Sequence, residues 1–164
     1  MKYLSILLIT ISASYVIRAN GNEINLCKSD EIEIAACQID EPKERLISFC
    51  LDKKRDVVNY RFGKKKSMEL TTKFTNENQL QRWTDVGTYT VYLGFKRGEY
   101  SYSFGIPQET INAKAFLSIK RKGERLGHDK LCVGNSFGDK NISSNAIIDI
   151  DDEDVRNSSF DFPK

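Results

Sequence analysis

Hydrophobic and polar residues alternate with a period of two along most of this chain. The clearest case is a pair of alternating runs, 88–95 and 99–104, joined by three residues that include Gly98. Two such runs with a short glycine-containing connection predict a β-hairpin. No segment sustains the 3.6-residue period of an amphipathic helix. Turn residues bound six further segments of strand character: 31–36, 45–51, 57–63, 67–72, 113–120 and 125–133.

This pattern predicts an all-β domain over residues 20–134, an antiparallel sandwich or small barrel of about seven to eight strands. After Cys132 the composition changes to glycine, serine, asparagine and aspartate, and the run 149–154 is strongly acidic. We therefore expect residues 135–164 to form a polar, acidic C-terminal tail, partly ordered, with one short element near 146–155.

The first residues have the layout of a secretory signal. A single lysine precedes an apolar run over residues 3–17, and a polar stretch begins at Arg18. The run is shorter than the roughly 20 residues of a membrane-spanning helix, and Ala19 suits a cleavage site. We interpret residues 1–19 as a signal peptide, with a retained anchor as the alternative. The prediction is a periplasmic or secreted protein, not inserted in a membrane once the signal is removed.

Removal of the signal also changes the charge. The whole chain has 25 basic and 23 acidic residues, and the loss of Lys2 and Arg18 makes the two numbers equal. A neutral domain is not drawn to nucleic acid by its overall field, so we expect no nucleic-acid partner. The overall neutrality favours the interpretation that the basic connections are ordinary solvated loops. The alternative is one positive surface that binds an acidic cleft or an anionic glycan. It would use the basic residues of three connections: Lys53, Lys54, Arg55, Lys64, Lys65, Lys66, Lys96 and Arg97.

Four cysteines in an exported chain are candidates for structural disulfides. The predicted strand between Cys27 and Cys37 keeps its ends roughly 20 Å apart, whereas a disulfide needs Cα atoms within about 7 Å. A hairpin that turns near residues 40–42 returns Cys50 to the end of that strand far from Cys37. We therefore predict the pairs Cys27–Cys50 and Cys37–Cys132. A zinc site is the competing use, and it is disfavoured because no CxxC pair is present.

No group of residues in the sequence indicates an enzymatic reaction. His128, the only histidine, stands between Gly127 and Asp129 and is interpreted as a surface residue. No nucleophile has an assignable base, and there is no phosphate-binding loop or metal-ligand cluster. The acidic run 149–154 lacks the glycine and the terminal glutamate of an EF-hand loop. We expect no cofactor, no metal and no enzymatic activity.

The segment Tyr60-Arg61-Phe62-Gly63 is similar to a segment found in a known group of proteins. The chain resembles a group of small exported bacterial proteins of unknown function that share an early cysteine pair, a Ser-x-Cys strand, this segment, a tyrosine-rich hairpin and a last cysteine. The resemblance covers about residues 26–134 and implies an all-β exported domain with its activity open. The corresponding features here are Cys27 and Cys37, 48–50, 60–63, 89–104 and Cys132.

More loosely, the chain resembles the periplasmic lysozyme inhibitors, small disulfide-bonded β proteins that place a Ser-Gly-x-x-Tyr loop in the lysozyme cleft. The segment 85–89 has the glycine and the tyrosine but neither the serine nor the spacing. A neutral chain also lacks the negative field that would steer it to basic lysozymes. The resemblance implies Gly87 and Tyr89 as loop contacts, and the basic connections add Lys96 and Arg97 as candidate partner-binding residues.

Together these features predict an exported, non-enzymatic binding domain of the cell envelope, with a protein or a glycan as its partner. A lysozyme-inhibitor-like role is the most concrete version. One alternative is an envelope hydrolase acting on glycan or peptide through Asp or Glu residues that the sequence does not identify. Another is a secreted effector.

Overall fold

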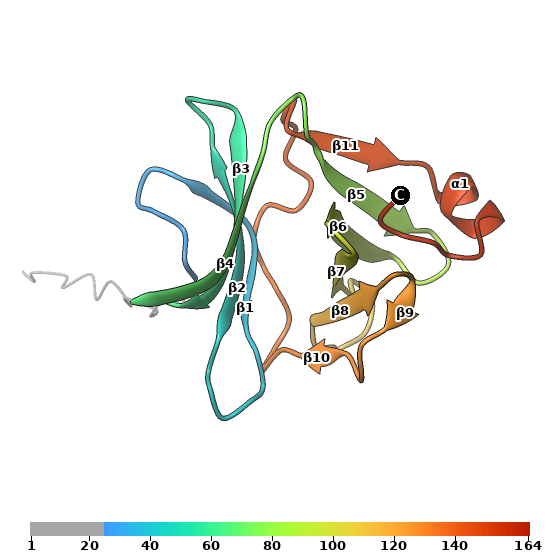
Figure 1. Cartoon of the computed structure of the whole chain (residues 1–164), viewed down its shortest axis with the longest axis horizontal. Helices are drawn as coiled ribbons and strands as arrows, with labels where there is room; N and C mark the ends of the chain where they lie inside the picture. Colours follow the sequence, from blue (N-terminus) through green and yellow to red (C-terminus); the bar gives the residue numbers. More distant parts are fainter. Residues whose placement is uncertain (1–24) are drawn as a thin grey trace, which may run out of the picture.

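The structure is a computed structural model that describes residues 25–164, so the predicted signal peptide, 1–19, lies outside the described residues. Two β-sheets face each other as two layers, with the hydrophobic core between them (Figure 1). The prediction of an all-β, disulfide-braced sandwich is confirmed. The described strands do not close into a barrel.

The smaller sheet has four antiparallel strands that pair in sequence order. Period-two alternation sends one set of side chains to the core: Ile47, Phe49 and Leu51 of the second strand are all at most 2% exposed. Each pair of neighbouring strands is a hairpin, as the turn signals predict. The strands are β1 (Ile32–Gln38), β2 (Leu46–Asp52), β3 (Val57–Lys64) and β4 (Ser67–Phe74).

The larger sheet has the order β10-β8-β7-β6-β5-β11, and β9 pairs with β8 beside this path. The predicted hairpin is confirmed as β6 and β7, while the segment predicted as a strand over 125–133 holds only the short β9 and β10. The strands are β5 (Leu80–Asp85), β6 (Thr90–Arg97), β7 (Tyr100–Ile106), β8 (Phe116–Arg121), β9 (Glu124–Arg125), β10 (Lys130–Leu131) and β11 (Ile147–Ile150).

Strand β5 was missed by the sequence analysis because its apolar residues face both sides. Leu80 enters the core and is fully buried, whereas Trp83, three residues later, lies on the outer face of the sheet. Residues three apart on a strand point to opposite faces, so no period-two pattern marks this segment. Trp83 is nevertheless only 5% exposed, because the C-terminal residues cover it.

The sheets are held face to face by aromatic side chains from both layers. Phe95 of β6 packs against Tyr60 and Phe74 of the smaller sheet, with ring centroids 4.9 and 5.2 Å apart. Phe104 of β7 lies 5.7 Å from Phe49 of β2. Each ring removes a large apolar area from water, and the tilted contacts suit the charge distribution of aromatic rings.

Residues 135–164, expected to be a tail, are part of the sandwich. Ser136 Oγ accepts a hydrogen bond from the backbone N–H of Ala36 at 2.9 Å, so this segment covers the free edge of β1. The chain then adds β11 as a parallel strand beside β5 and ends with α1 (Asp152–Asn157). Figure 1 shows α1 and the C-terminus on the side of the larger sheet that faces away from the smaller one.

Both predicted disulfides are present, with Cα–Cα distances of 5.4 Å for Cys27–Cys50 and 5.8 Å for Cys37–Cys132. The second one joins β1 of the smaller sheet to the residue that follows β10 of the larger sheet. Backbone hydrogen bonds flank it, from Asp40 N–H to the Leu131 carbonyl and from Val133 N–H to the Gln38 carbonyl, at 2.8 and 2.9 Å. The two sheets are therefore tied together at one edge by a covalent bond and a short ladder.

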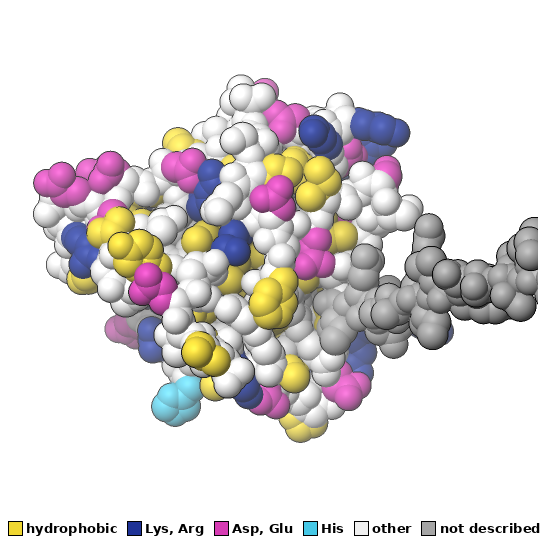
Figure 2. Space-filling view, turned by 180° about the vertical axis from the view of Figure 1, so that it is seen from behind, with side chains coloured by type: hydrophobic (Ala, Val, Ile, Leu, Met, Phe, Trp, Pro, Cys, Tyr) yellow, Lys and Arg dark blue, Asp and Glu magenta, His cyan; other side chains and the backbone are white. Residues whose placement is uncertain are grey.

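Charges of both signs cover the surface. On the face shown in Figure 2, lysine and arginine side chains lie among aspartate and glutamate side chains rather than in one large patch. Among the residues that the structure describes, no helix has the length and apolar character needed to cross a membrane.

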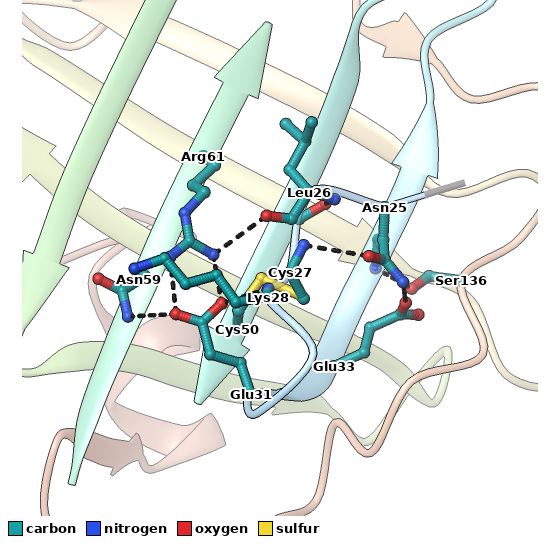
Figure 3. The surroundings of a disulfide bond; sticks show 12 residues. Asn25, Leu26, Cys27, Lys28, Glu31, Glu33, Cys50, Asn59, Arg61 and Ser136 are labelled. Carbon is teal, nitrogen blue, oxygen red and sulfur yellow. Dashed lines mark hydrogen bonds and ion pairs between the residues drawn. A yellow bond between two sulfur atoms is a disulfide. The ribbon is translucent and has the colours of Figure 1, made fainter. Parts of the chain in front are cut away.

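Residues 25–31, just before β1, lie across the outer face of the smaller sheet (Figure 3). The backbone N–H of Leu26 donates to Ser48 Oγ at 2.9 Å, and Cys27 is bonded to Cys50 on β2. Beside the disulfide, Arg61 of β3 donates to both carboxylate oxygens of Glu31 and to the Leu26 carbonyl. The N-terminal segment is thus fixed by a disulfide, by backbone hydrogen bonds and by an ion pair.

The ion pair is nearly enclosed, with side-chain exposures of 3% for Glu31 and 12% for Arg61. Burial by itself raises the pKa of Glu31, but the hydrogen bonds from Arg61 and from the Lys28 backbone outweigh it, so the pKa lies below its ordinary value. Asn59 donates a further hydrogen bond to the same carboxylate at 3.1 Å. All of its strong acceptor positions are therefore used within the protein.

The two disulfides are expected to contribute unequally to stability. Cys37–Cys132 spans 95 residues and Cys27–Cys50 spans 23, so the loop-closure model gives about 4.7 and about 3.4 kcal/mol. We expect the pair of substitutions Cys37→Ala and Cys132→Ala to lower the free energy of unfolding more than Cys27→Ala with Cys50→Ala. Urea unfolding followed by Trp83 fluorescence measures both, and the reverse order would contradict the model.

The Glu31–Arg61 pair predicts a pH dependence. A carboxylate whose pKa is depressed in the folded state stabilises the protein above its unfolded pKa, and that contribution is lost as the pH falls through the folded pKa. Arg61→Met is expected to lower the free energy of unfolding at pH 7 by about 2 kcal/mol. The figure is moderate because the Arg61 side of the ion pair is still partly in contact with water. This loss should shrink as the pH falls through the lowered pKa of Glu31, because the protonated carboxyl no longer forms the ion pair.

The matched control is Lys73→Met on β4, because Lys73 lies opposite Asn59 and is exposed without an ion-pair partner among the described residues. Urea unfolding at several pH values should give this variant a small effect that does not depend on pH. A penalty for Arg61→Met that stays constant at every acidic pH at which the chain remains folded would show that the ion pair does not carry the effect.

Candidate functional site

The loop between β5 and β6, residues 86–89, projects from one end of the larger sheet. Val86 and Tyr89 expose 58% and 53% of their surface. Tyr89 also has a φ of +49°, in the left-handed region that a bulky residue rarely adopts. Such a backbone persists only where neighbouring contacts hold it.

Asp85, at the end of β5, supplies the first of these contacts. Its carboxylate accepts hydrogen bonds from the backbone N–H of Gly87 at 2.9 Å and from Thr88 Oγ1 at 2.8 Å, and it forms an ion pair with Arg156 of α1. Asp85 is only 8% exposed. The short side chain thus closes the turn from within, as aspartate commonly does in loops.

Helix α1 supplies the second contact. The Asp152 carboxylate accepts hydrogen bonds from Trp83 Nε1 at 2.8 Å and from Arg156 Nε at 2.7 Å. The hydrogen bond from Arg156 lowers the pKa of Asp152, and the bonds from Trp83 and from the Val86 backbone act in the same direction. Arg156 therefore bridges Asp85 and Asp152, so the loop is fastened both to its own strand and to the helix.

A groove lies beside this loop on the outer face of the larger sheet. Its volume is about 350 Å³. Strand residues form its floor, the C-terminal residues form one wall, and the connection between β9 and β10 contributes the opposite wall. We call it the aromatic groove, and it is lined by Trp83, Asp85, Tyr92, Ser103, Phe116, Ser118, Lys120, Arg125, Asp129, Phe160 and Phe162.

Two glycines in the floor make room for the aromatic rings. A Cβ on Gly94 of β6 would come within 2.5 Å of the Phe162 ring, and a Cβ on Gly105 of β7 would come within 2.3 Å of the Phe116 ring. The rings therefore lie flat on the bare backbone, a known compensation for glycine in a sheet. Any larger residue at either position would push an aromatic wall out of place.

Tyr92 occupies the middle of the groove. Its ring stacks on Trp83 across the strand pair, with centroids 4.6 Å apart and planes 14° from parallel. Burial raises the pKa of Tyr92, and the negative charges of Asp85 and Asp129 raise it further. The phenol is therefore a neutral hydroxyl at physiological pH, and it has the Thr90 side chain as a hydrogen-bond partner.

A second hollow of about 330 Å³ lies over β3 and β4, beside Glu31 and Arg61. Glu31 and Arg61 on its rim are paired with each other, whereas Tyr60 Oη and Thr72 Oγ1 of its lining residues have no hydrogen-bond partner among the described residues. Cys27, Cys50 and Glu31 also have potential metal-ligand atoms within 4.8 Å of one another, but both sulfurs belong to a disulfide and neither is a thiolate.

The four predicted partner-binding residues do not form one surface. Gly87 and Tyr89 lie in the β5–β6 loop, where Gly87 packs against the Arg156 guanidinium. Lys96 and Arg97 lie at the other end of β6, roughly 25 Å away along the strand. The other basic connections are likewise divided, because 53–55 and 64–66 lie at opposite ends of β3. These residues therefore do not form one continuous positive surface.

Several residues of this region were not singled out from the sequence: Asp85, Asp152, Arg156 and the groove residue Phe116. The signal for Asp85 was present, since an aspartate two residues before a glycine is a common turn former. Asp152 and Arg156 gave no such signal, because their partners are about 70 residues earlier in the chain.

Asp85→Ala removes the acceptor of three hydrogen bonds in the loop. We expect the free energy of unfolding to fall by about 2 kcal/mol and the Gly87 amide to exchange faster with solvent. Hydrogen exchange followed by NMR, with urea unfolding, measures both effects. The control is Asp161→Ala, an exposed carboxylate near the C-terminus. Unchanged exchange at Gly87 in Asp85→Ala would mean that the loop is held by other contacts.

Comparisons with known protein families, characterised proteins and solved structures give no match. What the chain does is therefore inferred from its own residues and geometry.

Proposed function

We propose that the chain is an exported, non-enzymatic binding domain that inserts the β5–β6 loop into a cleft of a partner protein, in the manner of a lysozyme inhibitor. The observation that carries this proposal is the exposure of Val86 and Tyr89 on a loop tied down by Asp85 and Asp152. Apolar side chains exposed on a fixed loop are suited to burial in a concave partner site.

The energetic argument rests on preorganisation. Association costs free energy when loops and side chains must be ordered, and a loop that is already fixed avoids much of that cost. Tyrosine is among the residues that most often dominate binding energy, since it adds a large apolar ring and a hydroxyl. Tyr89 projects from a strained backbone position that its neighbours maintain, so its direction is set before the partner arrives.

The cysteines and the first residues support a proposal for the location of the protein. Two disulfides fit an oxidising compartment, and the N-terminal sequence resembles a secretory signal. We therefore propose a periplasmic or secreted site of action. Because the chain without residues 1–19 is formally neutral, contacts made by the loop, rather than long-range steering, would supply the affinity.

The hydrolase alternative receives less support from the same region. A pair of catalytic carboxylates would have to reach a substrate, but Asp85 already holds Gly87, Thr88 and Arg156. Asp129 accepts a hydrogen bond from Ser118 and lies 3.6 Å from Arg125. Both carboxylates are committed to neighbours, which suits a binding surface better than acid–base chemistry.

The test is a binding assay of the disulfide-bonded chain against c-, g- and i-type lysozymes, read by surface plasmon resonance and by lysozyme activity. We expect saturable binding to at least one class and a loss of at least about tenfold in affinity for Tyr89→Ala, the effect of removing about 1.4 kcal/mol of contact energy.

Phe137→Ala is the matched control, because Phe137 is 89% exposed and lies outside the loop. It should bind as the unchanged chain does. Absence of binding to all three classes at micromolar protein would contradict the inhibitor role, and equal losses in the two variants would contradict the role of the loop.

A further inference from the structure

We propose that the aromatic groove is a binding site for an uncharged saccharide. This site is separate from the exposed tip of the β5–β6 loop, although the two share Asp85 at their boundary. Its volume of about 350 Å³ falls in the range of small-molecule sites and suits a short stretch of sugar rings.

The first argument is the arrangement of aromatic rings. Phe160 is 52% exposed, and Tyr92 and Phe116 are partly exposed, so three rings present surface to the groove from three different elements. Sugar rings carry apolar C–H faces that bury well against aromatic faces. Trp83 and Phe162, each at most 5% exposed, lie behind these rings and keep them in place.

The second argument is the polar groups between the rings. The hydroxyls of Ser103 and Tyr92, together with the remaining lone pairs of Ser118 and Asp129, which are hydrogen-bonded to each other, offer donors and acceptors within one hollow. Hydroxyl groups of a sugar both donate and accept hydrogen bonds, so they match such a mixed lining. An apolar ligand would instead bury these polar groups without partners, at a cost in free energy.

The third argument is the charge of the lining. Asp85 and Asp129 are balanced by Lys120 and Arg125, so the formal charges of the lining cancel. Both carboxylates are also engaged locally, Asp85 by Arg156 and Asp129 by Ser118. An uncharged ligand gains from this arrangement because it leaves those pairs intact, whereas a cation or an anion would have to compete with them.

The experiment uses the disulfide-bonded chain and an array of uncharged oligosaccharides, including chitohexaose, cellohexaose, maltohexaose and laminarihexaose. Trp83 is the only tryptophan and its ring stacks on that of Tyr92, so its fluorescence reports occupation of the groove. We expect saturable binding to at least one member of the array, a change in Trp83 emission and NMR shifts confined to the groove residues.

Two substitutions from different walls test the site, Phe160→Ala and Phe116→Ala. Each should weaken saccharide binding at least about tenfold, because each removes one stacking face. Phe116→Ala leaves the C-terminal segment untouched, so it separates loss of contact from loss of the helix brace. Phe137→Ala, which alters an exposed ring elsewhere, should bind as the unchanged chain does.

The outcomes also separate this inference from the proposed function. Tyr89→Ala should leave saccharide binding unchanged, because Tyr89 is not among the groove residues. Absence of saturable binding across the array, or a preference for charged over uncharged sugars, would overturn the inference while leaving the loop proposal standing. Full binding by both groove variants would overturn it as well.

Discussion

The Cys37–Cys132 disulfide is the constraint on which the rest of the structure depends. It joins the edge of one sheet to the edge of the other, and the flanking backbone hydrogen bonds fix the register at that edge. Once Cys132 is fixed beside β1, the next residues must continue along the β1 edge. The Ser136 contact with Ala36 follows from this path. The route of the last thirty residues therefore starts from a single covalent bond, which also closes most of the domain.

That route ends on the face that carries the β5–β6 loop and the aromatic groove. Strand β11 adds to the larger sheet beside β5, and α1 then places Asp152 and Arg156 against Trp83 and Asp85. The same C-terminal segment supplies Phe160 and Phe162 to the wall of the aromatic groove. The β5–β6 loop and the aromatic groove thus both depend on the C-terminal segment, and the contacts that form each of them join residues far apart in sequence. This face is held by charge-assisted hydrogen bonds together with the apolar cluster of Trp83, Val155 and Phe162.

The sequence predicted those parts of the fold that local rules control. The hairpin of β6 and β7 follows from alternation and a short glycine turn, and the disulfide pairs follow from the rise of a strand. The alternation pattern does not predict β5, because Trp83 faces away from the core and is covered by the C-terminal residues. The resemblance to lysozyme inhibitors pointed to the loop with Gly87 and Tyr89. The sequence did not predict that Asp152 and Arg156 hold this loop, since no local pattern indicates a partner about 70 residues away.

The acidic run shows why composition misled at the C-terminus. A block of carboxylates suggests a solvated tail when its charges have no partners, and sequence shows the charges but not the partners. Here Asp149 pairs with Arg82 of β5, whose guanidinium also donates to the Lys140 carbonyl at 2.9 Å. Asp151 caps α1 by accepting from the Glu153 N–H, and Asp152 holds Trp83 and Arg156. Three of the carboxylates thus have fixed partners, and two of those partners, Arg82 and Trp83, lie on a strand formed much earlier in the chain. The parallel pairing of β11 requires β5 and its neighbours to be in place first, so this segment is expected to order only after the larger sheet has formed.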